Sequence, residues 1–181
     1  MITFRELTAD EIDVRIGQVD KDGRYLTCLL YKDARCDMAI LDKTVGAENW
    51  EREHYECKGN LFCKVGINTN YANESSQPNW VYKSDCGSES NTEKEKGEAS
   101  DSFKRACVNW GIGRELYTAP FIYIPATDES GSPNFRFKNG KCKDKFVVTK
   151  IAIDKKKITG LAIWNTSINK RVFVYAENKG Q

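Results

Sequence analysis

One long amphipathic segment, residues 91–113, constrains the fold of this chain more than any other feature. The apolar residues Ala99, Phe103, Ala106 and Trp110 recur at helical spacing and form a single stripe along it. Such a helix lays one side on a core and can offer basic side chains to an anionic partner. A neighbouring polar face follows a four-residue spacing and consists of Lys96, Ser100 and Lys104.

The segments ahead of this helix predict an α+β fold with a β-β-β-α core. Its three strands are expected to form an antiparallel meander, and the helix, which begins near Asn91 or Thr92, covers one face. Alternating side chains and the turn at Lys58-Gly59 indicate the strands. Their expected ranges are residues 50–57, 60–67 and 79–85.

Helices are predicted ahead of the meander. Thr8 and Glu11 form a capping box, which predicts a first helix that continues through Ile16. Asp33 is expected to cap a second helix that stops at Gly46. The predicted strands outside the meander are residues 25–31, 121–125, 146–153, 158–164 and 171–175.

The length of 181 residues favours one domain with an appended piece. We expect residues 1–125 to form the main domain. Residues 126–181 are expected to form a small, basic, β-rich C-terminal extension that packs on or adjoins it.

Charge is distributed unevenly along the chain. The whole chain carries a net charge of +2, but residues 136–181 hold twelve basic and three acidic side chains. A basic C-terminal segment on a chain of nearly balanced charge indicates an anionic partner. The alternative is a solvated segment whose lysines protect strand edges from aggregation.

The seven cysteines do not follow a metal-binding pattern. No C-x-x-C pair occurs and His54 is the only histidine, so the sequence predicts no zinc or other metal site and no cofactor. We interpret the cysteines as reduced, small core residues. The sequence has no secretory signal and no apolar run of about 18 residues, which predicts a cytoplasmic protein without a membrane partner.

Two enzyme classes are disfavoured. No G-x-x-x-x-G-K-[ST] loop is present, which excludes an ATP-driven recombinase that uses this phosphate-binding loop. A nuclease would need clustered carboxylates for divalent metal, whereas the acids at 93, 95, 98 and 101 alternate with basic residues on the long helix.

Two motifs carry a family resemblance, and they occur in the expected order around the meander. The first is Val-Gly-Ala-Glu-Asn-Trp at residues 45–50, and the second is Phe-Lys-Arg-Ala-Cys-Val-Asn-Trp-Gly at residues 103–111. With these motifs the chain resembles the Rad52 family of single-strand DNA annealing proteins, most closely the phage and prophage members. The likeness spans about residues 7–125.

The resemblance implies an annealing and recombination protein without a covalent catalytic site. Such a protein holds single-stranded DNA in a basic groove of an oligomeric ring or filament and anneals complementary strands without ATP. Its implied partners are single-stranded DNA, further copies of the chain, and a host or phage single-strand binding protein or exonuclease. If the chain is phage-encoded, it would act in the bacterial cytoplasm.

The resemblance also implies a set of DNA-binding residues. Lys104 and Arg105 carry over directly, together with Lys96, and Arg35 lies close to a groove arginine of the relatives. Val108 replaces a further basic residue that some relatives have. The remaining candidates are basic residues near the same elements, namely Arg114, Lys64 and Lys83.

Several alternatives stay open at this point. Arg105 could pair with Asp101 on its own helix, and Arg114 could serve as a helix C-terminal cation. The fold pattern also suits a module for double-stranded RNA, or a non-enzymatic interaction protein. Aromatic residues divide into core candidates, namely Trp50, Trp80 and Trp110, and exposed candidates, namely Tyr55, Tyr82 and Tyr117.

Overall fold

The computed structural model describes residues 2–73, 75–88 and 94–177, and the chain divides into two compact units. The expected start of the long helix near Asn91 lies outside the described residues. The sequence predicts a main domain of residues 1–125 with residues 126–181 as an extension. Whether residues 1–125 fold by themselves stays a prediction. The first unit contains Met1–Arg5 and Ala34–Arg114, and the second contains Glu6–Asp33 and Glu115–Gln181.

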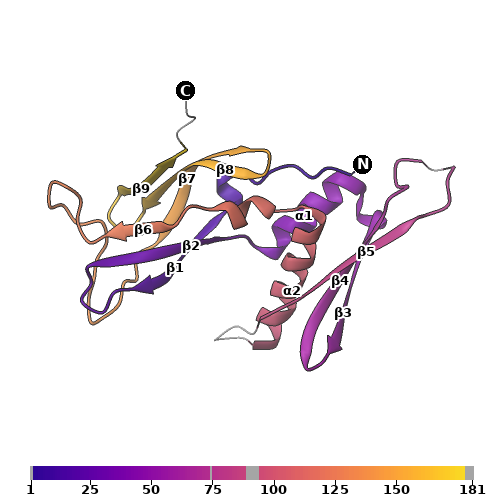
Figure 1. Cartoon of the computed structure of the whole chain (residues 1–181), viewed down its shortest axis with the longest axis horizontal. Helices are drawn as coiled ribbons and strands as arrows, with labels where there is room; N and C mark the ends of the chain where they lie inside the picture. Colours follow the sequence, from indigo (N-terminus) through magenta and orange to yellow (C-terminus); the bar gives the residue numbers. More distant parts are fainter. Residues whose placement is uncertain (1, 74, 89–93, 178–181) are drawn as a thin grey trace. The chain divides into compact units, whose positions relative to one another are not determined.

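The first unit contains the predicted β-β-β-α core. Its strands form an antiparallel sheet in the order β3-β4-β5, and α2 lies across one face of it (Figure 1). Lys58 and Gly59 both have positive φ, so the β3–β4 hairpin closes with a two-residue turn that follows the twist of its strands. The elements are α1 (Ala34–Val45), η2 (Ala47–Asn49), β3 (Trp50–Cys57), β4 (Asn60–Asn68), β5 (Trp80–Cys86) and α2 (Lys94–Trp110).

The apolar stripe of the long helix is confirmed. Phe103 and Ala106 are fully buried, and Ala99 and Trp110 are half-buried. Phe103 stacks on Trp50 with ring centroids 6.1 Å apart, which joins the helix to β3. The core between α1, α2 and the sheet also buries Ile40, Leu41, Cys63, Val65 and Ile67.

The second unit contains a six-stranded sheet in the order β6-β2-β1-β7-β8-β9. The three predicted C-terminal strands are present, but they belong to this larger sheet because β1 pairs with β7 at Asp13 and Val147. Its elements are η1 (Ala9–Glu11), β1 (Asp13–Val19), β2 (Tyr25–Tyr31), β6 (Ile122–Pro125), β7 (Phe146–Asp154), β8 (Lys157–Asn165) and β9 (Lys170–Ala176), with η3 (Arg114–Thr118) beginning at the last residue of the first unit.

The predicted first helix is wrong beyond one turn. The capping box exists, because the Thr8 amide donates to the Glu11 carboxylate at 2.9 Å, but it closes only the 3₁₀ turn η1. From Asp13 the chain is a strand paired with β2. The half-buried residues Val14 and Ile16 alternate with exposed ones, and this period of two outweighs the helical spacing of Ile12 and Ile16.

The interpretation of the cysteines as core residues holds for three of the seven, whereas Cys57 is exposed and the other three are half-buried. All seven lie among the described residues and are free thiols, and Cys28, Cys63 and Cys107 are buried. Burial raises the pKa of Cys28 to about 12 and that of Cys63 to about 11, so both thiols stay protonated at neutral pH. Buried, protonated thiols act as small apolar side chains.

Candidate nucleic-acid interface

The face of the three-stranded sheet beneath α2 carries one cation on each of its two edge strands. Strand register places Arg52, Val65 and Lys83 side by side on this face. The Arg52 guanidinium lies over the Phe103 ring at 4.8 Å, and the Lys83 ammonium lies over the Trp110 ring at 4.7 Å. These contacts hold two exposed cations against the aromatic part of the helix stripe.

Lys83 and Arg114 meet at the C-terminal end of α2. The Lys83 ammonium donates to the carbonyl oxygen of Asn109 at 2.8 Å, and Arg114 Nη2 donates to the same oxygen at 3.2 Å. Arg114 also reaches the carbonyl oxygen of Val108, with distances of 3.3 Å from Nε and 3.1 Å from Nη2. Both side chains therefore complete carbonyl groups that the end of the helix leaves without intrahelical donors.

Arg105 joins this group through β5. Its Nε lies 3.4 Å from Oδ1 of Asp85, and the Asn109 side chain donates to the Ser84 carbonyl at 3.0 Å and to Asp85 at 3.4 Å. We call Lys83, Asp85, Arg105, Asn109 and Arg114 the helix-end cluster. It carries three cations and one carboxylate.

Lys104 stands next to Arg105 on α2. It is half-buried, and its ammonium has no ion-pair partner in the part of the chain that the structure describes. The Arg105 side chain remains 40% exposed beside Asp85. The predicted pair thus keeps positive charge available at the surface of the helix.

The other predicted site residues lie elsewhere in the first unit. Lys64 points to the sheet face opposite α2, where it pairs with Glu53 at 2.6 Å and lies 5.2 Å from the Tyr82 ring. The hydrogen bond to Glu53 raises the pKa of Lys64. Lys96 is exposed near the start of α2, about 20 Å along the helix axis from Asn109 at 1.5 Å per residue. Arg35 is exposed in the first turn of α1.

The exposed aromatic candidates are exposed as predicted. Tyr55, Tyr82 and Tyr117 are 37%, 45% and 68% exposed. On the sheet face opposite α2, Tyr55 stacks on Phe62 with centroids 5.5 Å apart, and Trp80 stacks on Tyr82 at 6.4 Å. Any base stacking by these rings stays a prediction.

Sequence reasoning missed Asp85, Asn109 and Arg52. The alternation along β3 and β5 was the available signal, because it places Arg52 and Asp85 on the face of the buried residues Cys63 and Val65. Asn109 carried no such signal, since a polar residue in the last turn of a helix is usually solvated.

The described residues form neither a metal-binding cluster nor a membrane-spanning helix. No group of three or more His, Cys, Asp and Glu side chains among them could hold a metal ion. None of the helices they form has both the length and the apolar composition that a bilayer crossing requires.

Comparison with known proteins decides the family. Residues 5–135 match the family model described as Rad52/22 family double-strand break repair protein. The chain belongs to the Rad52/22 family. The matched range contains α1, the meander and α2, so it includes every residue of the helix-end cluster. Membership places the chain in DNA recombination and repair.

The resemblance inferred from the two sequence motifs is thereby confirmed at the level of the Rad52 family, while the phage type stays a prediction. No curated protein and no solved structure matches this chain. The residues after 135, including β7, β8 and β9, lie outside the matched range.

Proposed function

We propose that this Rad52-family chain binds single-stranded DNA through the helix-end cluster and Lys104, and that it anneals complementary strands. Binding that ignores sequence requires cations that displace counterions from phosphates, and it needs no pattern of base contacts. The observation that carries the proposal is the convergence of Lys83 and Arg114 on the Asn109 carbonyl, beside Arg105.

The cations of this cluster keep donors for a phosphate. An ammonium has three N–H donors, and Lys83 uses one on Asn109. A guanidinium has five, and Arg114 makes three contacts with two carbonyl groups. Because their positions are fixed by backbone carbonyls, these side chains lose little freedom when a strand binds.

We further propose that annealing needs neither ATP nor a covalent catalytic step. Strand pairing supplies the specificity, so the protein has only to hold backbones and leave bases accessible. The chain would work as a homo-oligomeric ring or filament, because β3 and β5 are edge strands of the described sheet and one cluster holds too few phosphates for tight binding. A single-strand binding protein or exonuclease would be its partner in the cytoplasm.

The test combines binding, annealing and assembly. Labelled oligo(dT) should bind more tightly than duplex DNA or duplex RNA in competition, which separates the proposal from an RNA-duplex module. Complementary strands labelled for energy transfer should anneal equally well with and without ATP and magnesium. Electron microscopy with single-stranded DNA should show oligomers. A strict need for ATP hydrolysis, or a strictly monomeric mass with DNA present, would overturn the corresponding part.

A further inference from the structure

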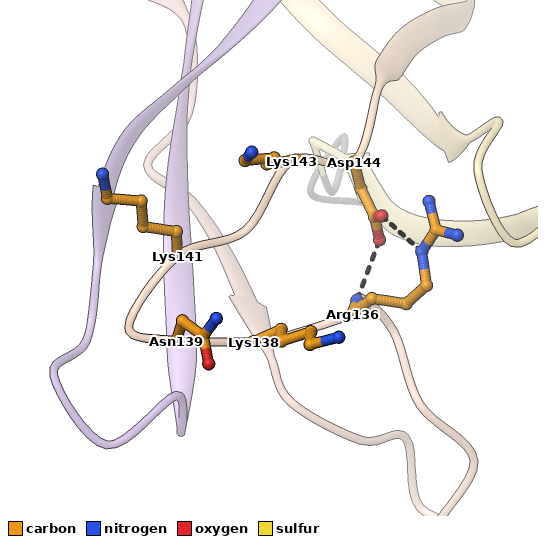
Figure 2. A pocket seen from close by; sticks show the side chains of 6 residues that line it. All are labelled: Arg136, Lys138, Asn139, Lys141, Lys143 and Asp144. Atoms are coloured by element: carbon orange, nitrogen blue, oxygen red, sulfur yellow. Dashed lines mark hydrogen bonds and ion pairs between the residues drawn. The ribbon is translucent and has the colours of Figure 1, made fainter.

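A cationic hairpin in the second unit lies beyond the part of the chain that matches the family. Residues 136–144 contain four basic side chains and one acidic one, and they form a short antiparallel turn. Figure 2 shows the side chains around the hollow that this turn encloses. The lining residues are Arg136, Lys138, Asn139, Lys141, Lys143 and Asp144.

Backbone geometry puts two lysines directly opposite each other. The Lys138 amide donates to the Lys141 carbonyl at 3.0 Å, and the Lys141 amide donates to the Lys138 carbonyl at 3.1 Å. Asn139 and Gly140 between them have φ of 53° and 73°, as a two-residue hairpin turn requires. Figure 2 shows the side chains of Lys138 and Lys141 pointing away from each other, so the turn spreads its positive charge over both of its sides.

The lysines of the hairpin are not neutralised by any described carboxylate. Lys138, Lys141 and Lys143 are exposed and have no ion-pair partner among them. The one carboxylate of the hairpin, Asp144, is engaged by Arg136, whose Nε lies 2.7 Å from its Oδ1. The hairpin therefore keeps a concentration of positive charge that an anion would stabilise.

The hairpin is also held in a fixed position at its base. Asp144 is buried and accepts hydrogen bonds from the Arg136 amide at 2.9 Å and from the buried side chain of Asn165 at 2.8 Å. On the other side, Phe137 packs on the β1–β2 turn so closely that a Cβ on Gly23 would lie 2.4 Å from its ring. A charged turn with a rigid base is prepared for a ligand and loses little freedom on binding.

We propose that this hairpin is a second binding site for the phosphate backbone of DNA, separate from the helix-end cluster. Its lysines are point charges suited to phosphates, and Arg136 keeps its two terminal nitrogens beyond the Nε bond to Asp144. Phosphate groups are the same in every sequence, so contacts made to the backbone carry no sequence information. The site therefore binds without sequence preference. This inference rests on the proposed function, because it gives the same protein a second contact with DNA.

Lysine footprinting on the full chain tests the site directly. The protein is acetylated with an N-hydroxysuccinimide ester, with and without oligo(dT) or duplex DNA, and mass spectrometry reports modification of each lysine. We expect protection of Lys138, Lys141 and Lys143, with Lys150 on β7 unchanged as an internal control. The two DNA forms show whether the site takes a single strand, a duplex or both.

The possible outcomes separate this inference from the proposed function. Protection of Lys83 and Lys104 without protection of the hairpin overturns the second site and leaves the proposed function intact. Protection of the hairpin alone supports the second site and removes the helix-end cluster from DNA binding. No protection anywhere overturns both.

Matched variants test the same site in solution. The double variant Lys138→Ala/Lys141→Ala should lower the slope of log affinity against log salt by about two, because each phosphate contact contributes about one released counterion. The control Lys150→Ala/Lys155→Asn removes the same charge elsewhere in the unit. Asn is chosen at 155 because the φ of 49° there disfavours Ala. Equal slopes in the two variants would overturn the proposal.

A third variant separates binding from folding. Lys138→Glu reverses one charge on an exposed side chain of the hairpin, so it should weaken DNA binding while leaving the melting temperature close to that of wild type. A destabilised hairpin would lower both together. Stronger or unchanged binding by this variant would contradict a phosphate site.

Discussion

The ammonium of Lys83 lies 2.8 Å from the carbonyl oxygen of Asn109, so a lysine from an edge strand caps the last turn of the long helix. This contact serves the fold and the proposed function together. The carbonyl end of a helix attracts cations, and the remaining donors of the same cations can then face phosphates. The helix end thereby gathers basic residues that lie far apart in the sequence.

Lys83→Ala and Lys64→Ala form a matched pair of variants. Lys83 is exposed and Lys64 is half-buried, both lie over aromatic rings, and they occupy opposite faces of one sheet. We expect Lys83→Ala to lower the salt slope of oligo(dT) binding by about one, and Lys64→Ala to change it less because Glu53 already neutralises that lysine. Fluorescence anisotropy across a salt series measures both. An equal decrease of the salt slope in the two variants would place DNA on both faces of the sheet, as the prediction that Lys64 binds DNA requires.

The double variant Lys104→Ala/Arg105→Ala should bind all single strands more weakly to about the same degree. Two lost phosphate contacts would lower the salt slope by roughly one to two. The fold should survive, because Ala is a good helix former and a partly exposed pair such as Arg105–Asp85 contributes about 1 kcal/mol. Circular dichroism melts provide the control. Unchanged slope and affinity in a folded variant would exclude these residues from the site.

Asp85→Asn should act in the opposite direction. The Asp85 carboxylate is the one acid of the helix-end cluster, and it holds Arg105 at 3.4 Å. An amide of the same shape can still accept a hydrogen bond, and it removes the one negative charge of the cluster. We expect tighter oligo(dT) binding and a steeper salt dependence in the same titration. Weaker binding by a folded variant would show that Asp85 orients Arg105 more than it neutralises it.

Local patterns predicted the first unit well. The alternation along residues 60–67, the turn at Lys58-Gly59 and the stripe through Phe103 each depend on neighbours in the sequence, and all agree with the structure. The predicted Lys104-Arg105 pair does lie on an accessible surface of α2. Whether it contacts DNA stays a prediction.

Long-range pairing explains what the sequence did not predict. The six-stranded sheet depends on β1 pairing with β7, which joins residues 13 and 147, and no local pattern encodes such a partner. The capping box at Thr8 misled the assignment because a 3₁₀ turn uses the same two side chains as a helix. The helix-end cluster likewise depends on the register of β5, which places Lys83 and Asp85 against α2.

Phe103→Ala should lose binding only through unfolding. The Phe103 ring is completely buried, stacks on Trp50 and lies beneath the Arg52 guanidinium. Replacing a buried Phe by Ala costs about 3–5 kcal/mol, which is a large part of the stability of a small domain. Chemical denaturation measures the loss, and Phe103→Leu, which leaves a smaller cavity, is the control. A fully stable Phe103→Ala protein would mean that the stripe is not the core of this unit.

Acid should weaken the second unit through Asp144. Burial would raise the pKa of its carboxyl, but hydrogen bonds from Asn165 and Arg136 outweigh burial and hold that pKa below its ordinary value. A carboxyl with a lowered pKa stabilises the fold above its unfolded pKa of about 3.9, and that stabilisation is lost as pH falls through the folded pKa.

Asp144→Asn should therefore cost about 1–3 kcal/mol at neutral pH, where buried donors lose their charged acceptor. The difference in melting temperature from wild type should shrink below about pH 4. Glu129→Gln removes an exposed carboxyl from the same unit and should show no such convergence. A difference for Asp144→Asn that stays constant with pH would show that the geometry of the side chain, and not its charge, holds the base of the hairpin.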